Sequence, residues 1–284
     1  MSGPLLQLRG ITLDYGRGFR RQPFRALEGV DLEVGRGETV GLVGESGSGK
    51  SSLGRIVLGL QEPTAGSVHF DGADITRVDR RRRRALARDL QAVFQDPYSS
   101  LNPTRRIGLS VAEPLLQCRG ELTRAEIDAR VAEMLLRIGL DADAARRFPR
   151  HFSGGQRQRI AIARALIVSP KLVVCDEPVT ALDLSVQAQI LNLLAELQET
   201  LKLSYLFIAH DLSVVRFLCQ RVVVLCAGRV VEAGVVGDVF DAPGHPYTRE
   251  LLAAVPRANP DLNIPVREEA HTAVAEGGTR EEHD

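Results

Sequence analysis

The sequence has 284 residues, which is long enough for one large domain or for a domain that carries a subdomain. Its 36 basic and 36 acidic residues cancel, so it lacks the positive charge expected of a general nucleic-acid-binding protein. The four cysteines show neither C-x-x-C spacing nor a dense framework, which favours a reducing, cytosolic compartment. The sequence contains no run of about 18 apolar residues, so no membrane-spanning segment is predicted.

Two segments near the N-terminus, residues 5–14 and 27–34, alternate apolar and polar residues and are predicted to be strands with one covered face. Between them lies a polar loop, residues 15–24, that contains aromatic side chains. Tyr15 is the best placed of these to stack on an adenine ring. An aromatic residue that merely closes the end of a strand would give the same pattern.

Residues 44–51 read Gly-Glu-Ser-Gly-Ser-Gly-Lys-Ser, which fits the phosphate-binding pattern G-x-x-x-x-G-K-[ST]. The segment before them, 38–43, has strand character, and the segment after them, 52–60, has apolar residues at helical spacing. Glycines let backbone N–H groups turn toward phosphate oxygens, and a helix N-terminus favours an anion. Lys50 is expected to reach the terminal phosphates, and the Ser51 hydroxyl to bind Mg²⁺. The candidate phosphate-binding residues are Gly44, Glu45, Ser46, Gly47, Ser48, Gly49, Lys50, Ser51 and Ser52.

A glycine-rich surface turn could match this pattern by chance. The residue at position 50 speaks against that interpretation, because only 3 of the 36 basic residues are lysines and one of them stands there. A compact ammonium fits between phosphates where the planar guanidinium of Arg would not. The sequence therefore predicts a nucleotide-binding site.

A run of five arginines, Arg80 to Arg84, follows a turn at 62–66 and a strand at 67–70. Such a run could contact phosphates or a membrane surface. Because Asp79 and Asp89 flank it and Ala and Leu follow, a solvated helix face is the better interpretation.

A block of helices is predicted after the strand at 90–94, which ends at Gln95 and leads into a proline-containing loop. From about 107 to 167 the pattern is helical almost throughout, and Thr123 and Glu126 have the form of a capping box. A helical block that interrupts an α/β chain suggests a subdomain.

The segment Phe152-Ser-Gly-Gly-Gln156 opens an amphipathic helix predicted at 157–168. Ser153 is suited to the N-cap position, and the two glycines leave backbone N–H groups accessible. Taken alone, this is a weak signal for function.

Two acidic residues, Asp176 and Glu177, end the short apolar strand that starts at Lys171. At the carboxyl end of a parallel strand they would face a ligand, with Asp176 holding Mg²⁺ through water and Glu177 aimed at an attacking water. Two acids at a strand end are often only a turn, but the earlier phosphate loop favours the functional interpretation. A lone histidine is usually structural, yet His210 also follows a strand, 204–209, which suggests a contact with the γ-phosphate.

The last elements are predicted from similar patterns. A helix is expected at 184–201, and a hairpin is expected from 221–226 and 229–233. From about residue 256 the sequence is polar and mostly acidic, and we expect it to be disordered.

In this order, the motifs resemble those of the ATP-binding subunits of ABC transporters, and the resemblance covers residues 5–256. The matching motifs are the phosphate loop at 44–51, the glutamine at 95, the signature at 152–156, the strand with its glutamate at 172–177, the loop at 180–183 and the switch histidine at 210. Two positions depart from the common pattern: Phe152 stands where many members have Leu, and Thr180 stands where Ser is common. Neither change removes a group needed for the chemistry.

The resemblance implies an α/β fold: a P-loop NTPase cassette with a mainly parallel core sheet, an antiparallel β subdomain and an inserted helical subdomain at about 104–168. It assigns residues 1–255 to the ATP-binding domain. Residues 256–284 remain as a polar C-terminal tail.

The resemblance also implies hydrolysis of ATP with Mg²⁺, driven by positioning and charge. Glu177, His210 and Gln95 would be catalytic, and Ser51, Gln95 and Asp176 would hold the metal. In the family two cassettes, either copies of one chain or related chains, pair head to tail, so that the signature of one faces the ATP of the other. The residues implied to bind ATP beyond the phosphate loop are Tyr15, Gln95, Ser153, Gly154, Gly155, Gln156 and Asp183.

Two stretches, 94–103 and 244–256, look like the ATPases of oligopeptide, dipeptide and nickel importers. This implies two transmembrane permease subunits and an extracytoplasmic solute-binding protein as partners, no nucleic acid, and a peripheral place on the cytoplasmic face of the cell membrane. We expect Tyr98 and Leu101 to contact the permease. The alternative is a soluble ABC ATPase that acts in DNA repair or translation, which would normally carry two cassettes or nucleic-acid-binding insertions.

Overall fold

The computed structural model describes residues 3–16, 24–96, 101–117 and 122–254. Its strands are β1 (Leu6–Tyr15), β2 (Phe24–Val34), β3 (Thr39–Val43), β4 (Ala65–Phe70), β5 (Ala73–Asp74), β6 (Leu90–Val93), β7 (Leu172–Asp176), β8 (Ser204–Ile208), β9 (Arg221–Cys226) and β10 (Arg229–Val235). Its helices are α1 (Lys50–Val57), α2 (Arg80–Leu86), α4 (Ile107–Gln117), α5 (Arg124–Arg137), α6 (Gly154–Leu166), α7 (Leu184–Leu201), α8 (Leu212–Leu218), α9 (Val236–Asp241) and α10 (Pro246–Ala253), with 3₁₀ turns at Ala142–Arg146 and Pro149–His151.

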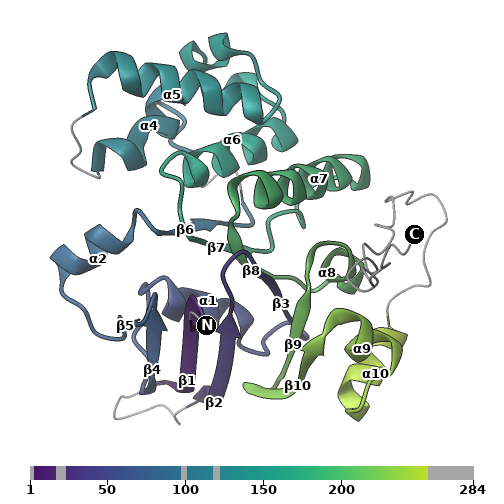
Figure 1. The fold of residues 1–284 in the computed structure, drawn as a ribbon. Coiled ribbons are helices and arrows are strands. Elements are labelled where there is room, and N and C mark those ends of the chain that lie inside the picture. The colour runs from purple at the N-terminus through teal and green to yellow at the C-terminus, as the bar shows by residue number, and fades with distance from the viewer. Residues whose placement is uncertain (1–2, 17–23, 97–100, 118–121, 255–284) are drawn as a thin grey trace, which may run out of the picture.

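The centre of the molecule is a six-stranded sheet in the order β10-β9-β3-β8-β7-β6 (Figure 1). The strands from β9 to β6 run parallel, and β10 pairs antiparallel with β9 at one edge. Every residue of β3 and of β8 is buried, as expected of strands in a sheet that is covered on both faces. The mainly parallel core sheet and the hairpin of β9 and β10 are therefore confirmed.

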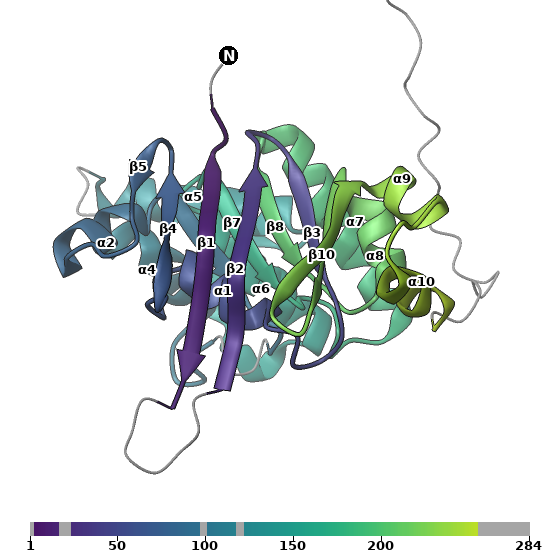
Figure 2. The same ribbon diagram turned by 90° about the horizontal axis from the view of Figure 1, so that it is seen from below.

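A second, antiparallel sheet has the order β2-β1-β4-β5 and lies over one side of the core sheet (Figure 2). Helix α1 lies between the two sheets. Its Leu53 and Val57 are fully buried in one apolar cluster with Leu32 of β2 and Leu206 of β8. Burial on both sides fixes the position of α1, and hence of the loop that precedes it.

Helices α4, α5 and α6 come between β6 and β7 in the chain and gather at the end of the molecule away from the four-stranded sheet (Figure 1). The predicted capping box of α5 is confirmed: the Glu126 N–H donates to Thr123 Oγ1 at 3.3 Å, and the Thr123 N–H donates to Glu126 Oε2 at 2.6 Å. Val131 and Leu135 of α5 are buried in a second apolar cluster, which also includes residues of α7 and α8. This cluster covers the other face of the core sheet.

The helix boundaries differ from those predicted at two glycine-rich starts. Helix α1 begins at Lys50 rather than at 52, and α6 begins at Gly154 rather than at 157, because Gly49 and Ser153 occupy the N-cap positions. The helices α8, α9 and α10 were not predicted. Residues 256–284, predicted to be disordered, lie outside the described residues.

The arginine run forms α2, and no residue of this helix is buried. Asp79 caps it, because the Asp79 Oδ1 atom accepts a hydrogen bond from the Arg82 N–H at 2.7 Å. The predicted solvated helix face is therefore confirmed. Within the described ranges, no helix combines the length and the apolarity that crossing a bilayer would require.

Candidate nucleotide-binding site

Four predicted site segments follow neighbouring strands of the core sheet at the same edge. The phosphate loop follows β3, His210 follows β8, Asp176 and Glu177 lie at the end of β7, and Gln95 follows β6. Because these strands are parallel and adjacent, segments far apart in the sequence leave the sheet side by side. The crevice outside the carboxyl ends of such strands is the usual place for a ligand in open α/β sheets.

Two glycines of the phosphate loop allow it to pack tightly between the sheets. Gly44 has a φ of +148° and Gly49 a φ of +106°, which residues with a side chain rarely adopt. A Cβ atom on Gly44 would overlap the Leu225 carbonyl oxygen, and one on Gly49 would lie 2.7 Å from the Ala26 carbonyl oxygen. The loop backbone is thus held in place by β9 and β2 just before the N-terminus of α1, where N–H groups favour an anion.

Lys50 begins α1, and its side chain turns back over the loop. The Nζ atom donates to the carbonyl oxygens of Gly44, at 2.7 Å, and Glu45, at 2.8 Å, and the residue is buried. Burial lowers the pKa of Lys50, whereas the nearby carboxylates of Glu177, Asp176 and Glu45 favour its charged form. An ammonium group has three donors, so a third remains for a phosphate oxygen.

Ser51 and Asp176 come together although 125 positions separate them. Ser51 Oγ donates to Asp176 Oδ1 at 3.1 Å. Burial raises the pKa of Asp176, and the hydrogen bond from Ser51 opposes this shift. A hydroxyl and a carboxylate are hard oxygen ligands of the kind that Mg²⁺ prefers, so the pair fits the predicted metal. In the same loop the buried Ser48 hydroxyl has no hydrogen-bond partner among the described residues, which fits an anionic acceptor there.

Glu177 has a left-handed backbone conformation, with a φ of +49°, which costs a non-glycine residue roughly 1–2 kcal/mol. Its N–H donates to the Ile208 carbonyl oxygen of β8 at 3.0 Å, which ties it to the neighbouring strand. Its Oε2 atom lies 3.6 Å from His210 Nδ1 and 3.4 Å from the Thr180 hydroxyl. These side chains line a pocket of about 90 Å³. A strained carboxylate residue in a pocket wall is a common feature of active sites.

Tyr15 lies at the end of β1, close to the start of α1. Its hydroxyl is 3.1 Å from Ser52 Oγ and donates to Gln61 Oε1 at 2.9 Å. The residue is 38% exposed, so part of its ring remains open to solvent. The hydrogen bonds give Tyr15 a structural role beside the loop, and its stacking on adenine stays a prediction.

The segment after β6 carries three predicted residues, Gln95, Tyr98 and Leu101. Gln95 is exposed, and within the described ranges no hydrogen bond or ion pair links it to Ser51 or Asp176. Its role as a metal ligand and catalytic residue stays a prediction. Leu101 is 3% exposed and belongs to the core, so the prediction that it contacts a permease was wrong. Treating the whole proline-containing loop as surface caused this error. Tyr98 lies outside the described residues.

The signature residues cap α6 and do not reach the phosphate loop of their own chain. Ser153 Oγ accepts from the Gln156 N–H at 3.3 Å, and Gln156 Oε1 accepts from the Ser153 N–H at 3.1 Å. Asp183 caps α7 by accepting from the Val186 N–H at 3.0 Å, and this bond lowers its pKa. Across the described residues, no hydrogen bond or ion pair joins either cap to residues 44–52.

Gly155 lets α6 pack closely against α7, because a Cβ atom at this position would overlap Val186 Cγ1. We expect Gly155→Ala to lower the free energy of unfolding, since overpacking costs about 1–3 kcal/mol and removing a helix glycine gains at most about 1 kcal/mol. Val186→Ala removes the overlapping methyl groups, so the double variant should recover part of the loss. Urea unfolding of the four proteins measures this coupling, and strictly additive effects would contradict the packing argument.

Sequence analysis missed one residue at the loop. The Glu45 N–H donates to the Tyr247 hydroxyl of α10 at 2.9 Å, across 202 positions of the chain. The stretch 244–256 was noted for its likeness to importer ATPases, but no spacing or periodicity relates it to the loop. An aromatic ring with a polar tip in the first turn of a helix was the available signal.

Known protein families match the chain over two regions. The family described as ABC transporter matches residues 27–180, and the one described as oligopeptide/dipeptide transporter, C-terminal region, matches residues 231–278. A putative peptide import ATP-binding protein of Brucella ovis is 48% identical over 258 residues, which are 91% of this chain and 80% of that protein. Another, from Brucella abortus, is 52% identical over 253 residues, which are 87% of this chain and 75% of that protein.

Solved structures of cassettes share the fold. The dimeric ATP-binding cassette MJ0796, bound to ADP and Pi, matches with a TM-score of 0.73 at 33% identity and covers 81% of this chain and 98% of its own. CbiO1 from Clostridium perfringens, part of the ABC transporter complex cbiONQ, matches with a TM-score of 0.75 at 29% identity. The match covers 89% of this chain and 96% of CbiO1. The resemblance based on the motifs is confirmed by these matches. The chain therefore belongs to the ABC transporter family, as one of its ATP-binding cassettes.

Proposed function

We propose that this chain is the ATP-hydrolysing motor subunit of an ABC transporter that imports peptides. The observation that carries the proposal is the presence, in one chain, of an ABC transporter match at 27–180 and an oligopeptide/dipeptide transporter C-terminal region at 231–278. Relatives at 48% and 52% identity are named as putative peptide import ATP-binding proteins, which supports the same class of solute. The alternative of a soluble ATPase in DNA repair or translation gains no support from these names.

The proposed reaction transfers the γ-phosphoryl group of ATP to water, and the chain contributes position and charge. The ammonium of Lys50 donates to phosphate oxygens, and Tyr15 stacks on the adenine. Ser51, Asp176 and Gln95 would hold Mg²⁺, which would supply positive charge to neutralise the phosphates. Glu177 orients the attacking water, and His210, 3.6 Å from its carboxylate, contacts the γ-phosphate.

We propose that a second cassette, a copy of this chain or a related one, completes each ATP site in a head-to-tail dimer. The caps at Ser153 and Asp183 are exposed, and helix starts offer N–H groups that favour an anion. Since neither cap is bonded to the loop of its own chain, a partner's ATP is the ligand they suit. The dimeric structure of the related cassette MJ0796 supports such pairing.

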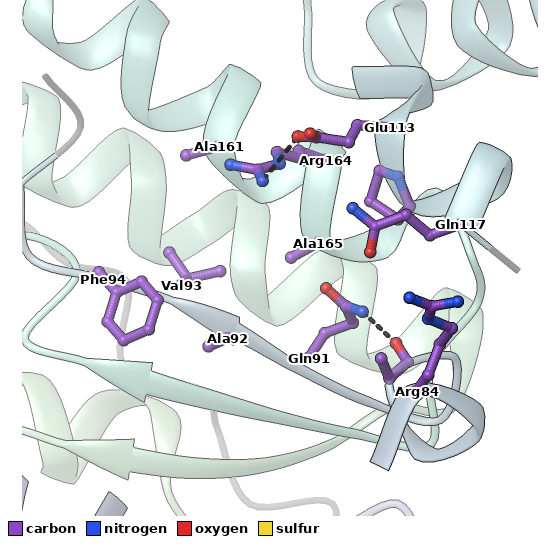
Figure 3. A pocket seen from close by; sticks show the side chains of 12 residues that line it. Arg84, Gln91, Ala92, Val93, Phe94, Glu113, Gln117, Ala161, Arg164 and Ala165 are labelled. Atoms are coloured by element: carbon purple, nitrogen blue, oxygen red, sulfur yellow. Dashed lines mark hydrogen bonds and ion pairs between the residues drawn. The ribbon is translucent and has the colours of Figure 1, made fainter. Parts of the chain in front are cut away.

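A pocket of about 380 Å³ between the helical block and the core sheet is the proposed docking site for a permease (Figure 3). Its lining comes from α2, β6, α4 and α6, and includes Arg84, Gln91, Phe94, Glu113, Gln117 and Ala161. Glu113 is held in the wall by ion pairs with Arg164, at 2.8 Å, and Arg105, at 3.1 Å. Because Phe94 precedes Gln95, a loop of the permease seated here would adjoin the edge of the nucleotide site.

The remaining proposals concern the location of the chain, its solute-binding partner and its domain organisation. Two permease subunits would hold the chain peripherally at the cytoplasmic face of the cell membrane, and a solute-binding protein would deliver the peptide from the other side. Residues 1–255 form the proposed ATP-binding domain, with its helical subdomain at about 104–168 and a separate tail at 256–284.

Filling the pocket tests the proposal. Gln117 lines it, so the larger ring of Gln117→Trp should keep the permease out of the pocket and lower membrane association and permease-stimulated ATP hydrolysis by about tenfold or more. ATP binding by the chain alone should not change. Leu116→Trp is the matched control, because Leu116 is 51% exposed on the same helix and does not line the pocket.

The measurements are membrane fractionation, ATPase assays and peptide uptake with the permease subunits co-expressed. If Gln117→Trp leaves peptide uptake and membrane association unchanged, the pocket is not the docking site. ATP hydrolysis that responds to nucleic acid and ignores the permease would favour the soluble alternative.

A further inference from the structure

Helix α10 lies beside the hairpin of β9 and β10 (Figures 1 and 2). The turn of that hairpin contacts the phosphate loop, because the Gly228 N–H donates to the Ser48 carbonyl oxygen at 3.0 Å. Tyr247 lies in its first turn and is half-buried against the core. The Tyr247 hydroxyl accepts the hydrogen bond from the Glu45 N–H at 2.9 Å. Burial raises the pKa of Tyr247, so this hydroxyl stays neutral at physiological pH.

The bond to Tyr247 holds one end of a peptide group whose other end is held by Lys50. The carbonyl oxygen of Gly44 and the N–H of Glu45 belong to the same planar peptide unit. Lys50 Nζ donates to that oxygen at 2.7 Å, and Tyr247 accepts from that nitrogen at 2.9 Å. A rotation of this peptide would break both bonds. Such a rotation changes the ψ angle of Gly44 and the φ angle of Glu45, and the two hydrogen bonds oppose it.

The start of α10 is itself fixed to β10 by hydrogen bonds. The carboxylate of Glu232, on β10, accepts from the Gly244 N–H at 2.7 Å and from the His245 N–H at 3.1 Å. His245 is the N-cap of α10, and its Nδ1 atom accepts from the Tyr247 N–H at 3.1 Å. A continuous set of hydrogen bonds therefore runs from Glu232 through the helix start to the peptide at Gly44 and Glu45.

We propose that Tyr247 is a positioning residue for the nucleotide site, and that it keeps the Gly44–Glu45 peptide oriented when Lys50 binds a phosphate. The inference rests on the proposed role of Lys50 in ATP binding. It gives the region that contains α10 an indirect part in binding ATP. Tyr247 acts through the loop and does not itself contact the phosphates.

The test is Tyr247→Phe, which removes the hydroxyl and keeps the ring. ATP titration of the purified chain should show affinity lowered by about 2- to 10-fold, the loss expected for one neutral hydrogen bond. Hydrogen exchange of a peptide fragment spanning 44–49 should become faster, because the Glu45 N–H has lost its acceptor. Tyr205→Phe is the matched control: its hydroxyl donates to the Leu194 carbonyl oxygen at 3.3 Å, within the core, so its removal should change neither measurement.

A second variant distinguishes positioning from simple packing. Glu232→Ala loosens the start of α10, so it should weaken ATP binding in the same way, and its effect should be largely lost in the Tyr247→Phe background. Unchanged affinity together with unchanged exchange at 44–49 in folded Tyr247→Phe protein would overturn the inference. If the unaltered chain failed to bind ATP at all, the proposed function would fail instead, while the exchange measurement would still test the bond to Glu45.

Discussion

Replacing Glu177 by Gln is expected to slow ATP hydrolysis by about 10² or more while ATP binding stays close to that of the unaltered chain. The amide keeps the size of the side chain and can still lie near His210 and Thr180. It loses the negative charge that would draw a proton from the attacking water. ATP binding persists because the phosphate loop, Lys50 and Ser51 are untouched, and because the bond from the residue 177 N–H to Ile208 does not involve the carboxylate.

Single-turnover ATPase assays and nucleotide titration measure the two effects separately. Glu196→Gln removes the same charge from an exposed position on α7 and should leave the hydrolysis rate and the ATP affinity near their original values. Turnover by Glu177→Gln at the original rate would place the critical carboxylate elsewhere in the crevice.

Lys50→Arg is expected to weaken ATP binding about tenfold or more although the positive charge is kept. Lys50 is 5% exposed, and its ammonium fits between two carbonyl oxygens of its own loop. A guanidinium is larger and planar, and it cannot enter this space without moving the loop. The loss of charge-assisted hydrogen bonds, each contributing about 1.5–3 kcal/mol, accounts for the size of the effect.

The matched control is Lys171→Arg, at the position directly before β7. The Lys171 side chain is 44% exposed and pairs with Asp71 and Asp89, a setting in which a guanidinium can replace an ammonium. Titration with ATP and with ADP should show lower affinity for Lys50→Arg and unchanged affinity for Lys171→Arg. Equal affinity of the unaltered chain and both variants would mean that the site accepts Arg at position 50 as well as Lys.

The parts of the site that were predicted from sequence are those in which the pattern and the contact are local. A strand followed at once by the glycine loop and a helix fixes residues 44–51, and the strand that ends in Asp176 and Glu177 is equally self-contained. Once both strands are assigned to one parallel sheet, the meeting of Ser51 with Asp176 needs only the rule that such strands end at a common edge.

The predictions that failed depend on tertiary context. The glycines at 154 and 155 read as loop, yet the Ser153 cap and the packing against Val186 start the helix three residues earlier than expected. Leu101 lies in a segment whose prolines and polar residues suggest a surface loop, and only the packed fold shows it in the core. The bond between Glu45 and Tyr247 requires α10 to be placed by Glu232, which no local pattern reveals.

The close contact of Gly155 with Val186 packs the start of α6 against the start of α7. Helix α6 carries the Ser153 cap at its start and Ala161 in the wall of the pocket farther along, a separation of roughly 12 Å at 1.5 Å per residue. If α6 moves as a rigid body, a displacement at Ala161 also displaces Ser153 and, through the contact of Gly155 with Val186, the start of α7 at Asp183. We therefore expect the two helix caps to move together.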